Sequence, residues 1–177
     1  SDTSKSVELI RQARESAEEA LALDPTSLDA QLAIAMIDWQ TLGRYRQAER
    51  TFQELVMVNP NHWQVRHQYG LLLLATGRRS EAIQSLRQAW QLHPLSMSVK
   101  VDHARAFWYG GNEQRAIQDA TRLRDRYDDS ILARGLLVDI YEQQGRYDLA
   151  ASIDDRIQLG DDVSAAGYFE ARQNRLA

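Results

Sequence analysis

The sequence predicts an all-α fold, a solenoid of stacked antiparallel helix pairs with about ten helices. Three observations lead to this prediction. Four glycines lie 34 residues apart, at Gly43, Gly77, Gly111 and Gly145. An alanine follows each of them by five residues, at Ala48, Ala82, Ala116 and Ala150. The segments between these markers place apolar residues at helical spacing, and a fixed period of this length is typical of helix-turn-helix repeats.

The chain opens with a predicted helix that lacks a partner. Residues 4–24 carry apolar side chains at helical spacing, among them Val7, Ile10, Ala17 and Leu21. The helix is expected to end at Asp24-Pro25, because the residue before a proline disfavours helical geometry. The alanines and the closing proline match the second helix of a repeat, so this segment is interpreted as a leading half-repeat.

Four full repeats are expected to follow, at 28–61, 62–95, 96–129 and 130–160. In each, a first helix (helix A) ends near the glycine, which suits a left-handed C-cap. A second helix (helix B) follows, and in the first repeat it is expected from Tyr45 to Val58, closed by Asn59-Pro60. Residues 161–177 are expected to form a capping helix. No linker interrupts the period, so residues 1–177 are predicted to be one array.

These residues resemble tetratricopeptide repeats (TPR). The family pattern places an aromatic residue four before the glycine, where the chain has Trp39, Phe107 and Tyr141, and a proline after helix B, where it has Pro60 and Pro94. The large aromatic that usually opens helix A is replaced by other residues: Leu32, Arg66, Lys100 and Arg134. The resemblance implies a right-handed superhelix whose concave groove is lined by one face of each helix A.

The residues thirteen, ten, six and three before each glycine make up this face, called here the helix-A face. It comprises Ala30, Ala33, Ile37, Gln40, Gln64, His67, Leu71, Leu74, Ser98, Val101, Arg105, Trp108, Leu132, Gly135, Asp139 and Glu142. Nine of the sixteen are apolar, counting glycine, and an apolar surface of this kind indicates that something covers it. The candidate partner-binding residues are Ile37, Gln64, His67, Leu71, Leu74, Arg105, Trp108, Asp139 and Glu142.

Composition excludes several other functions. The formal net charge of −4 comes from interleaved acidic and basic residues, so nucleic-acid binding is not expected. The longest apolar run, Leu71 to Ala75, is too short to insert into a membrane. There is no cysteine, which fits either cytoplasm or periplasm. The four histidines lack the spacing of helical metal ligands, and no nucleophile, carboxylate pair or phosphate loop is present, so no metal, cofactor or catalysis is expected.

The first functional hypothesis is a non-catalytic scaffold that binds a peptide, a helix or a neighbouring domain through the groove. Arg105 and Trp108 are expected to present a cation and an indole to an apolar segment carrying a carboxylate or carbonyl, beside Leu71 and Leu74. A homodimer is a second way to cover the groove. The chain begins with Ser1, and we expect it to be a segment of a longer protein. The alternative is a sensory or regulatory module of a larger signalling protein. The run from Leu71 to Arg78, followed by His93-Pro94-Leu95-Ser96, is similar to TPR tails of bacterial winged-helix transcriptional regulators and nucleotide cyclases.

Overall fold

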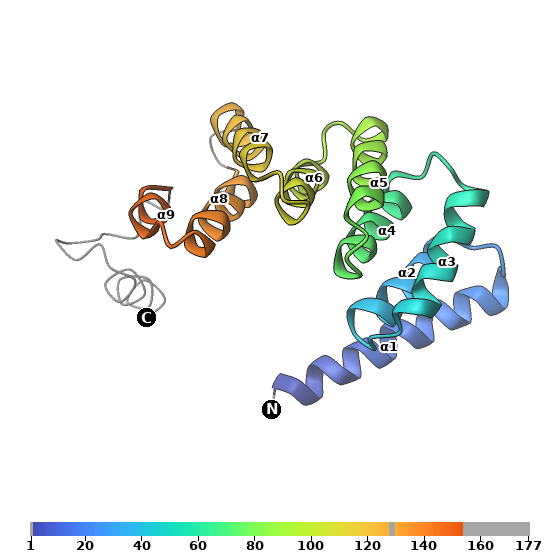
Figure 1. Ribbon diagram of the computed structural model, residues 1–177. Coiled ribbons are helices and arrows are strands. Elements are labelled where there is room, and N and C mark those ends of the chain that lie inside the picture. The colour runs from blue at the N-terminus through green and yellow to red at the C-terminus, as the bar shows by residue number, and fades with distance from the viewer. Residues whose placement is uncertain (1, 128–129, 154–177) are drawn as a thin grey trace. The chain divides into compact units, whose positions relative to one another are not determined.

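The computed structural model describes residues 2–127 and 130–153, and all the regular structure in these ranges is α-helical (Figure 1). A first compact unit, residues 1–94, contains α1 (Asp2–Leu23), α2 (Leu28–Gln40), α3 (Tyr45–Val58), α4 (Trp63–Ala75) and α5 (Arg79–Leu92). The second unit, from Leu95 onward, contains α6 (Met97–Tyr109), α7 (Glu113–Arg126), α8 (Ile131–Gln143) and α9 (Tyr147–Ile153). The all-α prediction is confirmed. The capping helix expected at 161–177 lies outside the described residues, and the single continuous array stays a prediction.

Each unit consists of helices that pack on their neighbours in the chain. In the first unit, α1 packs on α2, the pairs α2/α3 and α4/α5 form hairpins, and α2 also contacts α4. In the second unit, α6/α7 and α8/α9 form hairpins, α7 packs on α8, and α6 contacts α8. The first helices of consecutive repeats therefore lie side by side within each unit.

The four periodic glycines form the turns between paired helices. Their φ angles are 64° at Gly43, 78° at Gly77, 81° at Gly111 and 70° at Gly145. This left-handed conformation is unfavourable for a residue that has a Cβ atom, because the Cβ atom comes too close to the backbone. Glycine has no Cβ atom and adopts the conformation without that cost. After Gly77, the amide of Arg78 donates to the carbonyl of Leu73 at 2.8 Å, which satisfies a carbonyl at the end of α4. The same hydrogen bond, back to the carbonyl five residues earlier, recurs after Gly111 at 2.9 Å and after Gly145 at 2.8 Å. After Gly43, the amide of Arg44 donates instead to the carbonyl of Asp38, six residues earlier, at 2.7 Å.

Small and apolar side chains fill the space between the helices. The alanines five residues after the glycines are fully buried, at Ala48, Ala82, Ala116 and Ala150. In the first unit, a cluster around Phe52, Leu55, Val65 and Leu72 joins α3 and α4 with α2. In the second unit, Leu136, Leu137 and Ile140 of α8 pack with alanines of α6 and α7. The predicted apolar periodicity therefore corresponds to the observed core.

The lysine at an aromatic position of the family pattern is also buried. Lys100 in α6 is 8% exposed, and its Nζ donates to the hydroxyl of Tyr127 at 3.0 Å. The ammonium lies 4.8 Å from the centre of the same ring. The hydrogen bond from Lys100 lowers the pKa of Tyr127 below its usual value. Tyr127, which lies 27 positions later in the chain, is thus the hydrogen-bond acceptor of the buried Lys100 ammonium.

The α4/α5 hairpin depends on a glycine at the crossing of the two helices. A Cβ atom at Gly70 would lie 2.7 Å from Cγ and 2.9 Å from Cδ2 of Leu86, and 3.4 Å from the Leu86 amide nitrogen. Leu86 is fully buried, so its side chain has little space to move. Gly135 in α8 is exposed, and no heavy atom lies within 4 Å of its hypothetical Cβ.

We expect Gly70→Ala to lower the free energy of unfolding by roughly 1–3 kcal/mol, because the added methyl group overpacks the crossing. Gly135→Ala is the matched control and should raise stability by about 0.5–1 kcal/mol, since alanine suits an open helical position better than glycine. Urea denaturation followed by far-ultraviolet circular dichroism measures both. A Gly70→Ala variant as stable as the parent would contradict the close packing of α4 on α5.

A buried carboxylate attaches α1 to the rest of the first unit. The Asp38 side chain in α2 is 1% exposed, and its Oδ1 accepts from Arg14 of α1 at 2.8 Å and from Arg44 at 3.4 Å. The bond to Asp38 raises the pKa of Arg14. Nearby, Ala17 of α1 is 7% exposed. Because a buried carboxylate needs an opposite charge, the ion pair of Arg14 with Asp38 links α1 to α2.

We predict that Arg14→Ala destabilises the first unit by about 3 kcal/mol, because the Asp38 carboxylate would keep only the longer contact with Arg44. Arg11→Ala is the control on the same helix. Arg11 is half exposed and forms ion pairs with Glu8 and Glu15 of the same helix, so its loss should change stability by less than about 0.5 kcal/mol. Urea denaturation, with hydrogen exchange of the α1 amides, measures both. Equal effects of the two substitutions would show that Asp38 does not hold α1.

Candidate functional site

The first unit presents the helix-A face on α2 and α4. Ile37, Leu71 and Leu74 are half-buried, Gln64 is exposed, and His67 is 7% exposed. The amide of Gln40 in α2 donates to the side-chain oxygen of Gln68 in α4 at 3.2 Å, so the two helices are joined beside this surface. The three apolar candidate residues therefore keep part of their surface open to solvent while their backbone is fixed by helix packing.

A tryptophan that the sequence analysis did not select belongs to the same part of α4. The indole of Trp63 stacks on the imidazole of His93, with ring centres 4.5 Å apart, and on His67 at 6.5 Å. Trp63 precedes His67 by four residues, one helical turn, so it extends the same stripe of α4. This spacing was the signal available in the sequence. The contact with His93, beyond the end of α5, was not.

The second unit presents the helix-A face on α6 and α8. Trp108 is half-buried, packs against the core of this unit, and stacks on Tyr109 with ring centres 5.1 Å apart. Asp139 is exposed and Glu142 is half-buried. Val101, from the same helical stripe, is 2% exposed and belongs to the core. The accessible part of the face thus includes Ser98, Arg105 and Trp108 on α6 and Leu132, Asp139 and Glu142 on α8.

Arg105 already has a partner within the chain. Its Nη1 donates to Oδ1 of Asp102 at 2.6 Å, and the Arg105 side chain is 32% exposed. A carboxylate on a binding partner would have to compete with this intramolecular ion pair. The expected pairing of Arg105 and Trp108 with Leu71 and Leu74 joins residues of the two units, so it stays a prediction.

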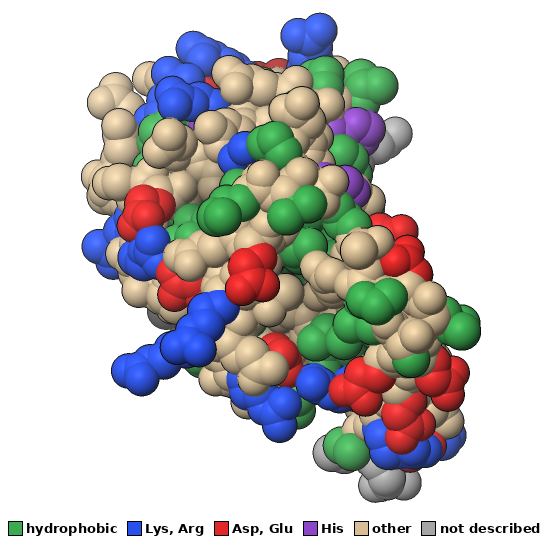
Figure 2. All heavy atoms as spheres, turned by 90° about the vertical axis from the view of Figure 1, so that its right-hand side faces the viewer, with side chains coloured by type: hydrophobic (Ala, Val, Ile, Leu, Met, Phe, Trp, Pro, Cys, Tyr) green, Lys and Arg blue, Asp and Glu red, His purple; other side chains and the backbone are tan. Residues whose placement is uncertain are grey.

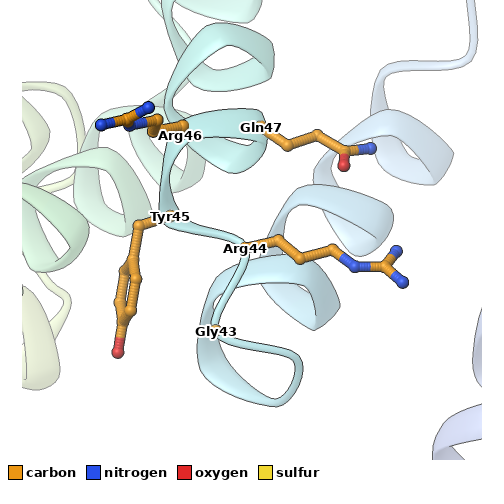
Figure 3. A pocket seen from close by; sticks show the side chains of 5 residues that line it. All are labelled: Gly43, Arg44, Tyr45, Arg46 and Gln47. Atoms are coloured by element: carbon orange, nitrogen blue, oxygen red, sulfur yellow. The ribbon is translucent and has the colours of Figure 1, made fainter.

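A shallow depression of about 490 Å³ lies beside the turn between α2 and α3. Its lining comes from a single segment: Gly43, Arg44, Tyr45, Arg46 and Gln47. In Figure 3, Arg44 and Gln47 extend to one side, Arg46 extends to the opposite side, and Tyr45 points away from them. Because these polar groups do not converge on one point, the depression lacks the geometry of a ligand site.

The carboxylates whose pKa values are lowered do not belong to the helix-A face. Lowered pKa values occur at Glu8 and Glu81, where arginine side chains donate hydrogen bonds, and at Asp24, where Thr26 does so. All three lie off the helix-A face. In residues 2–127 and 130–153, no three His, Asp or Glu side chains gather as metal ligands would. Nor is any helix of that part both long and apolar enough to span a bilayer.

The surface carries charges of both signs. Figure 2 shows Lys and Arg side chains interspersed with Asp and Glu side chains, with hydrophobic groups between them. Interleaved charges of this kind do not create the extended positive surface that phosphate backbones require.

Comparison with known proteins agrees with this geometry. Two models of the tetratricopeptide repeat match, over residues 9–71 and residues 101–173. No curated protein sequence is similar enough to the chain to count as a relative.

Several solved structures share the fold. A tetratricopeptide repeat protein from Parabacteroides merdae aligns with a TM-score of 0.76 and 17% identity over 97% of this chain, which spans 66% of that protein. A thermophilic TPR protein from Thermus thermophilus aligns with a TM-score of 0.74 and 17% identity, covering 98% of this chain and 92% of that one. The protein MamA aligns with a TM-score of 0.65 and 15% identity, covering 99% and 95%.

The two sequence matches cover most of the chain, the left-handed glycines recur at the expected period, and the helices pair as in the solved TPR structures. The chain therefore belongs to the tetratricopeptide repeat family.

Proposed function

We propose that this chain is a non-catalytic scaffold that binds a protein or peptide through its helix-A face. Membership of the TPR family supports a role in protein–protein interaction. The observation that carries the finer proposal is the partial exposure of apolar side chains on this face. Ile37, Leu71 and Leu74 in the first unit, and Trp108 in the second, are held by helix packing while part of each side chain stays accessible.

Preorganisation makes these side chains suitable anchors. A side chain that is already fixed by its neighbours loses little conformational entropy when a partner covers it, so more of the burial free energy is available for binding. Trp108 is stacked on Tyr109, and Trp63 is stacked on His93. Aromatic anchors in such positions supply much of the binding energy in known interfaces.

A catalytic role has no support in the described residues. Among them, no three His, Asp or Glu side chains gather as metal ligands would. We therefore propose that the specificity of partner binding comes from the shape of the helix-A face, its apolar contacts and its charges. The purified chain is expected to show no turnover in hydrolase and transferase screens.

Site-specific photo-crosslinking tests the proposal. A photoreactive phenylalanine analogue at Gln64 or Ser98, both exposed on the helix-A face, should capture a partner from extracts of the source cells. The same analogue at Glu54 of α3 or Gln118 of α7, exposed on second helices of repeats, provides the controls. Mass spectrometry should find one partner shared by the first two positions and absent from the controls. Equal capture at all four positions would contradict binding through this face.

A further inference from the structure

Two glutamine side chains form a hydrogen-bonded pair between α2 and α4. The Nε2 of Gln40, at the end of α2, donates to the Oε1 of Gln68 in α4 at 3.2 Å. Gln40 is exposed and Gln68 is half-buried, so a partner protein has access to the pair. A side-chain amide has two N–H donors and an oxygen that accepts. One hydrogen bond between two amides therefore leaves further donors and acceptors for a third group.

The remaining atoms of this pair match the backbone of an extended peptide. The Oε1 of Gln40 can accept a hydrogen bond and the Nε2 of Gln68 can donate one, and neither atom has another partner in residues 2–127 or 130–153. In an extended chain, the N–H and C=O of a single residue point to the same side, where a neighbouring strand bonds to both. An acceptor and a donor side by side can therefore bind one residue of an extended segment as a neighbouring strand does.

Aliphatic side chains flank the glutamine pair. Ile37 precedes Gln40 by three residues and Leu71 follows Gln68 by three, so each lies about one helical turn from the pair. Leu74 lies one turn beyond Leu71. All three aliphatic side chains are half-buried. These five residues are called here the glutamine patch, and they combine polar atoms at the centre with apolar surface beside them.

The two helices that carry the glutamine patch contain few charged residues. Three residues of α2 and α4 have a formal charge at pH 7, whereas α6 and α8 contain six. Asp38 is fully buried and paired with arginines, and Arg66 donates to Gln88 of α5. Asp29 is exposed in the first turn of α2, about 16 Å along the helix from Gln40. A charged group placed on the patch would therefore lose water without gaining an opposite charge from either helix.

We propose that the glutamine patch binds an extended, uncharged segment of another protein in which two aliphatic residues flank a central residue. The N–H of the central residue donates to the Oε1 of Gln40, and its C=O accepts from the Nε2 of Gln68. The two aliphatic side chains point to the same face of the extended segment and lie against Ile37, Leu71 and Leu74. The inference rests on the proposed function and specifies the chemistry of the partner.

The test uses synthetic peptides, titrated into the 15N-labelled full chain and followed by NMR. The first is acetyl-Ser-Gly-Leu-Ser-Leu-Gly-Ser-amide, and the second replaces the N–H of its central serine with an ester oxygen. The first peptide should bind saturably and shift the side-chain amide signals of Gln40 and Gln68 and the backbone signals of Ile37, Leu71 and Leu74. The ester peptide should bind about fivefold more weakly, because it lacks the donor to Gln40.

Charged peptides and salt test whether the patch prefers an uncharged segment. Two further peptides carry lysine or glutamate in place of both leucines, and neither should bind, because the patch offers no opposite charge. The affinity of the first peptide should change less than about twofold between about 0.05 M and about 0.5 M sodium chloride, since the complex contains no ion pair.

A glutamine-to-leucine variant separates backbone recognition from apolar contact. Gln40→Leu removes the acceptor but enlarges the apolar surface, so the first peptide should bind about fivefold more weakly and the ester peptide should bind equally well. Gln84→Leu adds the same side chain at an exposed position of α5 and is the matched control. It should change the affinity less than about twofold and preserve the difference between the two peptides. The dispersed amide spectrum of each variant shows whether it is folded.

Four results would overturn the inference. Tighter binding of the first peptide by Gln40→Leu would reduce the patch to an apolar contact, and equal binding of the amide and ester peptides by the parent chain would exclude backbone recognition. Tighter binding of the lysine or glutamate peptide would reject an uncharged partner, and absence of binding by the first peptide would reject the site. None of these results removes the proposed function, because photo-crosslinking at Gln64 and Ser98 tests the helix-A face without assuming the chemistry of the partner.

Discussion

The left-handed glycine turn is the constraint on which the repeat structure depends. At each of the four positions, a φ angle between 64° and 81° reverses the chain within a few residues and lets the next amide donate back to the preceding helix. This geometry fixes the angle at which each second helix leaves the first, and so it decides which side chains meet. The alanine five residues later is fully buried in all four repeats because this turn directs it toward the preceding helix.

Much of the fold could be predicted because its determinants are local. The glycine spacing, the buried alanines and the Asp24-Pro25 stop act within a few residues of themselves, so they are visible in the sequence. The environment of the residues that replace the usual aromatic of helix A was less predictable from the sequence. Lys100 occupies an aromatic position and is buried, because the hydroxyl of Tyr127, directly after the following helix, accepts a hydrogen bond from the Lys100 ammonium and the Tyr127 ring lies beside it. The repeat period of the sequence does not predict such a contact, because the two side chains lie far apart along the chain.

The same distinction applies to the candidate site. Helical geometry sufficed to select the residues of one face, since the direction of a side chain follows from its position along the helix. Helical geometry did not suffice to show which of these residues are accessible to a binding partner. Val101 shares the stripe but is buried in the core, Arg105 donates to Asp102, and Trp63 joins the surface through its stack on His93. These outcomes depend on rotamers and on neighbouring helices, which the position of a residue in the repeat does not determine.

The contact between Arg14 and Asp38 has a consequence for dividing this chain into fragments. A repeat boundary placed by counting residues would begin a fragment at α2, because the first full repeat of the period starts there. Such a fragment would keep the Asp38 carboxylate but lose the closer of its two arginines, and the partner that remains is 3.4 Å away. The smallest fragment of the first unit that keeps both arginine partners of Asp38 therefore begins with α1, one helix earlier than the period suggests. Arg14 of α1 supplies the closer counter-ion of a carboxylate in the repeat that follows it.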